Sequence, residues 1–363
     1  MRTPPATLLG IALVLMAART PPAAAQENGS GPSTSGFYAV PFVIYSPETS
    51  WIFGVGGAGF SRASADTALK PSTYAASIQY SINGQYVFNP SAQLYFDEGR
   101  TLLEARVELV RSFEVYYGVG NEAPELDDPE YEMRRIQVRA EYLRQIGRVL
   151  AGPVGEFSDE KLRDARTNPF LRAESAPGQA ITREIGAGGT VLYDTRDRVY
   201  SSASGSLARL RIVGYPEWLG SEAGFTWIET DLRHYSSIGE DQVIAVQLYA
   251  EATGGNVPFF RLPALGGDER MRGFLRGRYR DRVSVTVQTE FRTGLFWRIG
   301  AVLFASLGEV SPSVGGISLN RFRHAAGAGL RYTVDETERL KIRVDYGVGP
   351  GTSGFYLTVD EAF

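Results

Sequence analysis

The sequence predicts an all-β protein, a transmembrane antiparallel β-barrel of about 16 strands. Segments of about ten residues alternate apolar and polar side chains with a period of two, which is the pattern of strands that have two different faces. After the N-terminal segment, no apolar run reaches the roughly 18 residues of a membrane-spanning helix. The 41 glycines, 19 tyrosines and 19 phenylalanines suit the tight turns and aromatic girdles of a membrane barrel.

The N-terminal residues have the organisation of a secretory signal peptide. Arg2 precedes an apolar stretch at residues 8–18, and three alanines follow at 23–25. The stretch is too short to span a membrane as a helix, and the alanines match an Ala-x-Ala cleavage pattern. We therefore expect three parts: a signal peptide at 1–25, a short periplasmic lead at 26–36 and an outer-membrane β-barrel domain at 37–363.

The clearest strand pattern lies at residues 283–292. Valines occupy positions 283, 285 and 287 on one face, and Ser284, Gln288 and Glu290 lie on the other. An even number of such segments favours closure, because a closed sheet leaves no unpaired backbone groups in hydrocarbon. The longer links at 121–132 and 255–282 are expected on the outer side. The predicted strands are 37–45, 51–62, 73–81, 85–97, 101–113, 133–146, 149–162, 181–194, 205–214, 225–236, 242–253, 283–295, 297–309, 323–333, 340–348 and 354–362.

A soluble β-sandwich or lipocalin-like barrel is the alternative all-β interpretation. Such a fold turns its apolar face inward around one core. Sixteen strands would enclose an interior too wide to fill with side chains. The opposite arrangement, with apolar side chains toward lipid and polar ones toward a lumen, therefore fits the pattern better.

Few residues favour enzymatic or metal chemistry. The chain has no cysteine, and its only histidines, His234 and His324, each stand alone within a strand segment. No nucleophile, base and orienting residue are grouped in the sequence. The formal net charge of −4 gives no general attraction to nucleic acid. We expect a protein that is not an enzyme, with no metal, no cofactor and no nucleic-acid partner.

The most unusual stretch is residues 265–282, which contain six arginines, four glycines and three acidic residues. This mixture indicates a shaped loop, and the planar guanidinium of arginine suits a fixed ion pair with a carboxylate across a confined lumen. With Arg272, Gly273 and Phe274 at its centre, the stretch resembles the Arg-Gly-Phe/Tyr loop of the BamA/TamA family, outer-membrane proteins of the bacterial surface antigen type. In that family the loop folds back into the barrel.

Other stretches resemble the same family, in the same order along the chain. Phe363 resembles the terminal aromatic residue of outer-membrane proteins that the assembly machinery reads. The resemblance implies location in the bacterial outer membrane and contact with its lipid. The matching stretches are 193–197, which includes the family-like strand motif Asp194, Arg196 and Asp197, and then 288–292, 327–332 and 344–347.

Two features depart from the family. Family members usually carry periplasmic polypeptide-transport-associated (POTRA) domains, but only the short lead precedes the first predicted strand, so we expect a barrel-only member. The family often places an aspartate where Ser306 stands in residues 304–308, opposite the loop arginine. The usual ion pair cannot form there, and we expect Arg272 to pair instead with Glu290 or Asp345, which point into the lumen.

The resemblance implies insertion or translocation of other outer-membrane proteins. A family insertase opens a weakly paired seam between its first and last strands, here 37–45 and 354–362, and offers a strand edge as a template. Unfolded outer-membrane proteins would then be the clients, and a separate periplasmic partner would supply the missing platform. The alternatives are a passive channel or porin narrowed by the arginine-rich loop, and a structural barrel with no transport.

Overall fold

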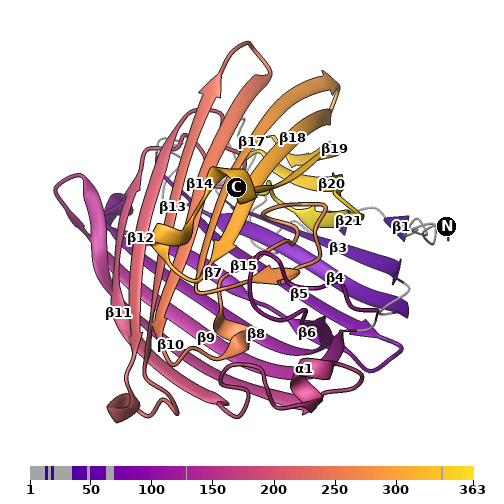
Figure 1. Cartoon of the computed structure of the whole chain (residues 1–363). Helices are drawn as coiled ribbons and strands as arrows, with labels where there is room; N and C mark the ends of the chain where they lie inside the picture. Colours follow the sequence, from indigo (N-terminus) through magenta and orange to yellow (C-terminus); the bar gives the residue numbers. More distant parts are fainter. Residues whose placement is uncertain are drawn as a thin grey trace, which may run out of the picture.

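The structure, a computed structural model, describes residues 13–14, 18–19, 35–46, 50–62, 69–127, 129–336 and 338–363. In this part of the chain, one antiparallel sheet of nineteen strands curves around a lumen (Figure 1). Two of these, β1 and β2, have two residues each, and β6 and β7 both pair between β5 and β8 as parts of one interrupted strand. Sixteen strands therefore form the wall, which confirms the predicted all-β fold.

Every segment predicted from the period-two pattern coincides with a wall strand, and the ends agree within three residues. The wall consists of β3 (Ser35–Ser46), β4 (Ser50–Ser61), β5 (Ser72–Ser81), β6 (Tyr86–Phe88) with β7 (Ser91–Phe96), β8 (Thr101–Val115), β9 (Glu130–Ile146), β10 (Val149–Asp164), β11 (Arg183–Asp194), β12 (Gly205–Tyr215), β13 (Phe225–Ser237), β14 (Gln242–Gly255), β17 (Val283–Phe296), β18 (Ile299–Ser311), β19 (Arg323–Asp335), β20 (Leu340–Gly349) and β21 (Thr352–Val359). The remaining elements are β1 (Leu13–Val14), β2 (Ala18–Arg19), the short helix α1 (Pro169–Arg172), the hairpin of β15 (Ala264–Leu265) and β16 (Tyr279–Arg280), and the 3-10 turns η1 (Asp97–Gly99), η2 (Glu217–Leu219), η3 (Phe259–Arg261), η4 (Val314–Gly316) and η5 (Leu319–Arg321).

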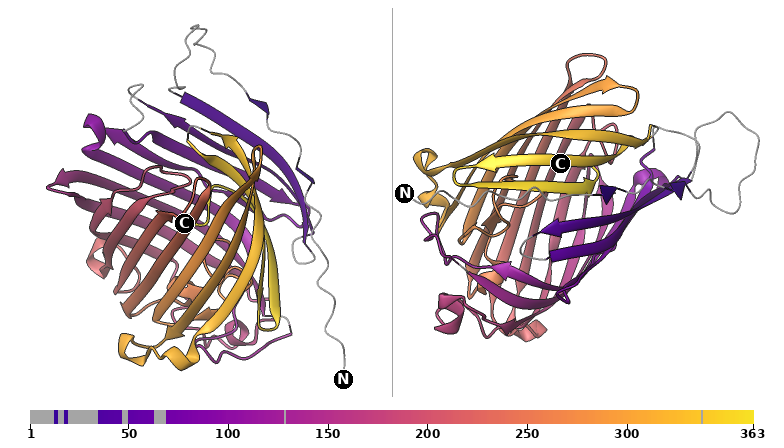
Figure 2. Two further views of the ribbon diagram at one scale, coloured as in Figure 1. Left: turned by 90° about the horizontal axis from the view of Figure 1, so that it is seen from above. Right: turned by 90° about the vertical axis from the view of Figure 1, so that its right-hand side faces the viewer.

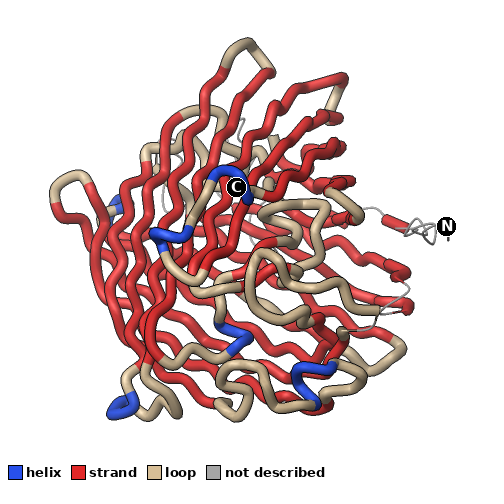
Figure 3. The backbone as a smooth tube through the Cα atoms, viewed as in Figure 1, coloured by secondary structure: helices blue, strands red, loops and turns tan. Residues whose placement is uncertain are grey.

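The long links all lie at one end of the barrel. Each of the links 116–129, 165–182, 256–282 and 312–322 follows a strand that runs in the direction of β3, so they share an end (Figure 3). The start of β3 and the end of β21 lie at the opposite end. This distribution is typical of outer-membrane barrels, whose extracellular loops are longer than their periplasmic turns. No helix in the described residues is long and apolar enough to cross a membrane.

The two faces of the wall differ as the sequence pattern predicts. On β14, Ile244, Val246 and Leu248 each expose more than a third of their surface on the outside. The alternate residues Gln247 and Tyr249 are buried in the interior. On β17 the polar positions 284, 286, 288, 290 and 292 are likewise buried. The lumen is therefore filled by polar and charged side chains, and the outer face is apolar.

The predicted signal peptide at 1–25 and lead at 26–36 lie mostly outside the described residues. Within them, the structure describes β1, β2 and the first two residues of β3. Both β1 and β2 pair antiparallel with β3, opposite Val43 and Phe42 and opposite Ala39 and Tyr38. They occupy the edge of β3 that faces away from β4.

The wall has a seam between its last strand, β21, and its first, β3. Antiparallel registers join each wall strand to the next from β3 through to β21, but among the described residues no register joins β21 back to β3. Figure 2 shows the yellow and indigo ends of the sheet at this seam. The last strand ends at Val359, three residues before the predicted end, because the final four residues turn into the lumen.

Candidate functional site

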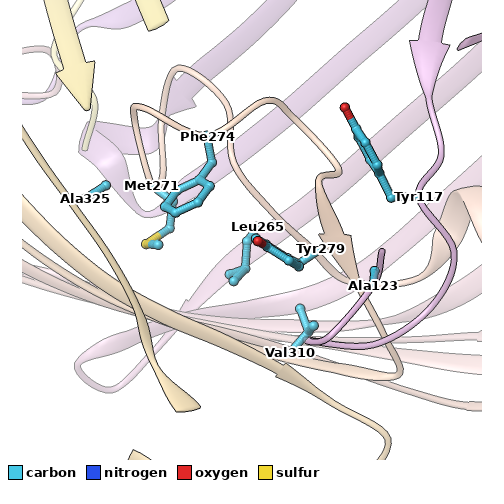
Figure 4. Packing of buried hydrophobic residues seen from close by; sticks show 8 residues of the cluster. All are labelled: Tyr117, Ala123, Leu265, Met271, Phe274, Tyr279, Val310 and Ala325. Carbon is cyan, nitrogen blue, oxygen red and sulfur yellow. The ribbon is translucent and has the colours of Figure 1, made fainter. Parts of the chain in front are cut away.

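The arginine-rich link between β14 and β17 folds into the barrel. It is tied by the β15–β16 hairpin, in which Leu265 pairs with Tyr279. Its apolar side chains pack with residues of the wall and of the link 116–129 into one buried cluster (Figure 4). The cluster consists of Tyr117, Ala123, Leu265, Met271, Phe274, Tyr279, Val310 and Ala325. Burial of these side chains fixes the loop tip against the lumen face of the wall.

Arg272 lies at the loop tip and is almost fully enclosed, with 1% of its surface exposed. Its Nη1 donates to Oδ2 of Asp345 on β20 at 2.6 Å, and its Nη2 donates to Oε1 of Glu290 on β17. The guanidinium carbon also lies 3.7 Å from the ring centroid of Phe304 on β18, a cation–π geometry. Both carboxylates expected from the sequence thus meet the same guanidinium, in the paired geometry that a buried charge requires.

Two glycines on neighbouring strands make this approach possible. A Cβ atom at Gly347 would lie 2.6 Å from the backbone carbonyl carbon of Arg272, so any side chain there would push the loop tip away. A Cβ at Gly329, which stands opposite Asp345 in the β19–β20 register, would lie 1.9 Å from Oδ1 of that carboxylate. Gly273 adopts a φ of 117°, a conformation that favours glycine.

The pair of carboxylates belongs to a larger buried charge network. Asp345 also accepts from Arg331 and Arg343, and Glu290 also accepts from Arg292. The segment after β21, residues 360–363, joins this network through Glu361 and Phe363. Glu361 pairs with Arg331 at 2.6 Å and Lys341 at 3.2 Å, and the carbonyl oxygen of Phe363 accepts from Arg292 at 2.9 Å.

This network explains why the chain leaves the sheet after Val359. The ring of Phe363 is 4% exposed and packs against Tyr235 on β13, with the Arg292 guanidinium 5.4 Å from its centroid. Phe363, which we proposed as an assembly signal, therefore lies inside the barrel in this structure.

Ser306 does not reach Arg272. Its hydroxyl points into the interior from β18 and donates to the carbonyl oxygen of Ala325 at 3.5 Å. Of the three candidate partners, Glu290 and Asp345 bind the guanidinium of Arg272, and Ser306 makes no hydrogen bond to it. The serine hydroxyl carries no charge and therefore could not replace a carboxylate as the ion-pair partner.

The motif of Asp194, Arg196 and Asp197 lies at the other end of the barrel, at the link between β11 and β12. Asp194 pairs with Arg196 at 3.0 Å and with Lys70 at 2.7 Å. Asp197 pairs with Arg339 in the β19–β20 turn at 2.8 Å. The motif therefore joins distant parts of the wall at the end where β3 begins and β21 ends.

Sequence reasoning missed most of the residues that complete the network around Arg272. These residues are Arg292, Phe304, Arg331, Arg343 and Glu361. A signal existed for two of them, because Arg292 shares a face with Glu290, and Arg343 shares one with Asp345. In the part of the chain that the structure describes, no group of three histidine or acidic side chains is arranged to hold a metal ion.

A model of the Omp85 superfamily domain matches residues 70–363. The chain belongs to the Omp85 superfamily. Its members are non-enzymatic barrel proteins, and the membership points to the bacterial outer membrane. The BamA/TamA resemblance read from the loop and strand motifs is thereby confirmed.

The fold of this Omp85 chain is similar to a crystal structure of BamA from Haemophilus ducreyi lacking POTRA domains 1–3. The TM-score is 0.57, and the sequence identity is 13%. The alignment covers 95% of this chain and 75% of the BamA chain. At such low identity the similarity concerns the fold. No curated protein matches the chain in sequence.

Proposed function

We propose that this Omp85 barrel assists the insertion of other β-barrel proteins into the outer membrane, with the edge of β3 as the template for an incoming strand. The observation that carries the proposal is the seam. No register joins β3 to β21 among the described residues, and the same edge of β3 pairs with β1 and β2 from the N-terminal segment. An edge that pairs with such short strands has backbone groups free for β-augmentation.

The lumen site supports this proposal by keeping the last strand short. β21 has eight residues, whereas β3 has twelve. Because Glu361 and Phe363 are held by Arg331 and Arg292, the segment after β21 turns inward instead of extending alongside β3. Among the described residues, the β3 edge is therefore left without a partner strand from the barrel wall itself. Unfolded outer-membrane proteins are the proposed clients, supplied by a separate periplasmic partner.

The test is the folding rate of a denatured outer-membrane protein into liposomes that contain this barrel. We expect acceleration relative to liposomes that contain an unrelated sixteen-stranded porin. The chain has no cysteine, so a cysteine pair at Tyr38 and Asp335 can be joined across the seam by a reducible bifunctional thiol reagent. Cross-linking should abolish the acceleration, and reduction should restore it.

A matched control places cysteines at His234 and Val246, which lie opposite each other on the paired strands β13 and β14. The same reagent at this site should leave the rate unchanged. Equal rates with the uncross-linked barrel and with the porin would refute the insertase proposal.

A passive channel is the second candidate, and one observation favours it. A cavity of about 960 Å³, lined mainly by charged and polar side chains, lies along the lumen. Another observation argues against a channel: side chains of the arginine-rich loop pack against the link 116–129 and obstruct that end of the lumen. Single-channel recordings separate the two: steady conductance by the wild type, without client folding, would favour the channel. A barrel with neither activity would be structural.

A further inference from the structure

A group of cations lies on the outer face of the wall, away from the lumen site and the seam. Arg111 on β8, Arg134 on β9 and Lys161 on β10 are exposed, and their neighbours Val110, Met133 and Glu160 are buried in the interior, so the cations point outward. The registers place Arg134 directly opposite both Arg111 and Lys161. Because neighbouring strands are about 4.8 Å apart, the three cations lie in a row of about 10 Å.

This row lies at the upper border of the apolar outer face. Below the row, away from the long links, the next outward residues of β8 and β9 are apolar. Leu109 pairs with Ile136, and Val107 pairs with Val138. Above the row are the ends of the strands and the links 116–129 and 165–182. The row therefore stands where the apolar band meets the headgroups of the outer leaflet. Tyr86, opposite Arg111, supplies the aromatic residue common at this boundary.

The charge of the row is only partly balanced by acidic side chains. Glu132 pairs with Arg111 at 2.7 Å, and Asp159 pairs with Lys161 at 3.3 Å. Among the described residues, Arg134 has no hydrogen bond or ion pair from its side chain, although it stands between two cations. Like charges directly opposite each other destabilise a sheet unless an anion lies between them.

Further charges surround the row on the same end of the wall. Arg163 and Arg183 are exposed on β10 and β11, and Asp164 is exposed next to them. The pair of Arg166 with Glu130, at 3.4 Å, contributes no net charge. Over the outward strand positions alone, five cations therefore stand against three carboxylates, and the balance on the wall itself is positive.

We propose that the outer face of β8, β9 and β10 binds the headgroup of a membrane lipid that carries more than one phosphate. Arg134, between Arg111 and Lys161, holds the central phosphate oxygens, and the apolar side chains below contact the acyl chains. A phosphate carries the charge and the acceptor oxygens that an arginine fork recognises. A row of three cations suits two phosphates on one headgroup better than a single phosphate. This site is independent of the proposed insertase activity.

The test is native mass spectrometry of the full chain in detergent with diphosphoryl lipid A. We compare the wild type with a double variant, Arg134→Gln with Lys161→Gln. A matched double variant, Arg144→Gln with Arg148→Gln, removes the same charge from exposed positions at the opposite end of the β9–β10 hairpin. We expect about tenfold weaker lipid binding in the first variant and unchanged binding in the second.

The lipid probe is varied in parallel. Monophosphoryl lipid A should bind the wild type more weakly than the diphosphoryl form, and inorganic phosphate should not displace the bound lipid. Equal binding in both double variants would overturn the proposal, as would displacement by phosphate alone, which would indicate a site for a free anion. An Arg134→Lys variant, which keeps the charge, should retain most of the binding.

Discussion

Arg272 is the residue on which the loop site depends. Its guanidinium bridges two carboxylates from strands far apart in the sequence and lies over the ring of Phe304. A buried charge is tolerated only when it is paired and hydrogen-bonded, so each member of the group requires the others.

We predict that Arg272→Ala lowers the free energy of unfolding by about 3 kcal/mol, because Glu290 and Asp345 each lose a partner in a closed interior. The measurement is guanidinium unfolding in detergent, followed by tryptophan fluorescence. Arg276→Ala is the control: this arginine lies in the same loop, is exposed and makes no ion pair or hydrogen bond within the described part of the chain. It should change stability by less than about 0.5 kcal/mol. An Arg272→Ala barrel as stable as wild type would contradict a structural role for the arginine.

At the scale of elements, the arginine-rich loop is held by close backbone approach as much as by charge. Its tip lies against β20, where Gly347 leaves no room for a side chain. The links at the same end of the barrel are joined to each other by smaller contacts, such as the one between Glu222 and Thr182.

We predict that Gly347→Val displaces the loop tip into the lumen, because the new side chain would overlap the backbone of Arg272 and Gly273. Trypsin should then cut the loop at its arginines faster than in the wild type. Gly155→Val, at a strand position where a Cβ would meet nothing within 4 Å, is the control and should leave cleavage unchanged. Equal cleavage of both variants would show that the close approach at Gly347 does not hold the loop.

We predict that the contact between the links 165–182 and 216–224 weakens in acid. The backbone N–H of Thr182 donates to Glu222 at 2.7 Å, and this hydrogen bond lowers the pKa of the carboxyl below its ordinary value. A lowered pKa stabilises the folded contact above the unfolded pKa, and the stabilisation is lost as pH falls through the folded value. Hydrogen exchange at the Thr182 amide should therefore lose protection below about pH 4, after correction for the intrinsic rate. Glu222→Gln should abolish that pH dependence; if the variant keeps it, another group is responsible.

At the scale of the whole molecule, side chains bridge the seam at one end. The hydroxyl of Tyr38 on β3 donates to Asp335 at 2.6 Å, and Arg62 after β4 pairs with Glu338 in the β19–β20 turn at 2.5 Å. We call these two interactions the seam contacts. They lie at the end where β3 begins, and they connect the first two strands to the last part of the wall.

We predict that a double variant, Tyr38→Phe with Glu338→Gln, opens the seam more often, because the hydrogen bond of Tyr38 is lost and Arg62 loses its charged partner, while the registers of the wall remain. Spin labels on β3 and β21, introduced into the cysteine-free chain, should give a broader and longer distance distribution. Tyr249→Phe removes a hydroxyl donated to Glu229 at 2.9 Å between paired strands and is the control. A distribution identical to wild type in the double variant would mean that other interactions hold the seam.

The sequence by itself determined the wall and the direction in which each side chain points, because the period of two is a local property of each strand. It also limited the partners of Arg272 to lumen-facing residues, with Glu290 and Asp345 among them. Only the tertiary structure decided that both carboxylates meet one guanidinium, that Glu361 and Phe363 join the same network, and that β21 ends before it can pair along β3. These contacts join residues 18 to 73 positions apart within the network, and they depend on the stagger of the strands around the barrel. No local pattern specifies that stagger.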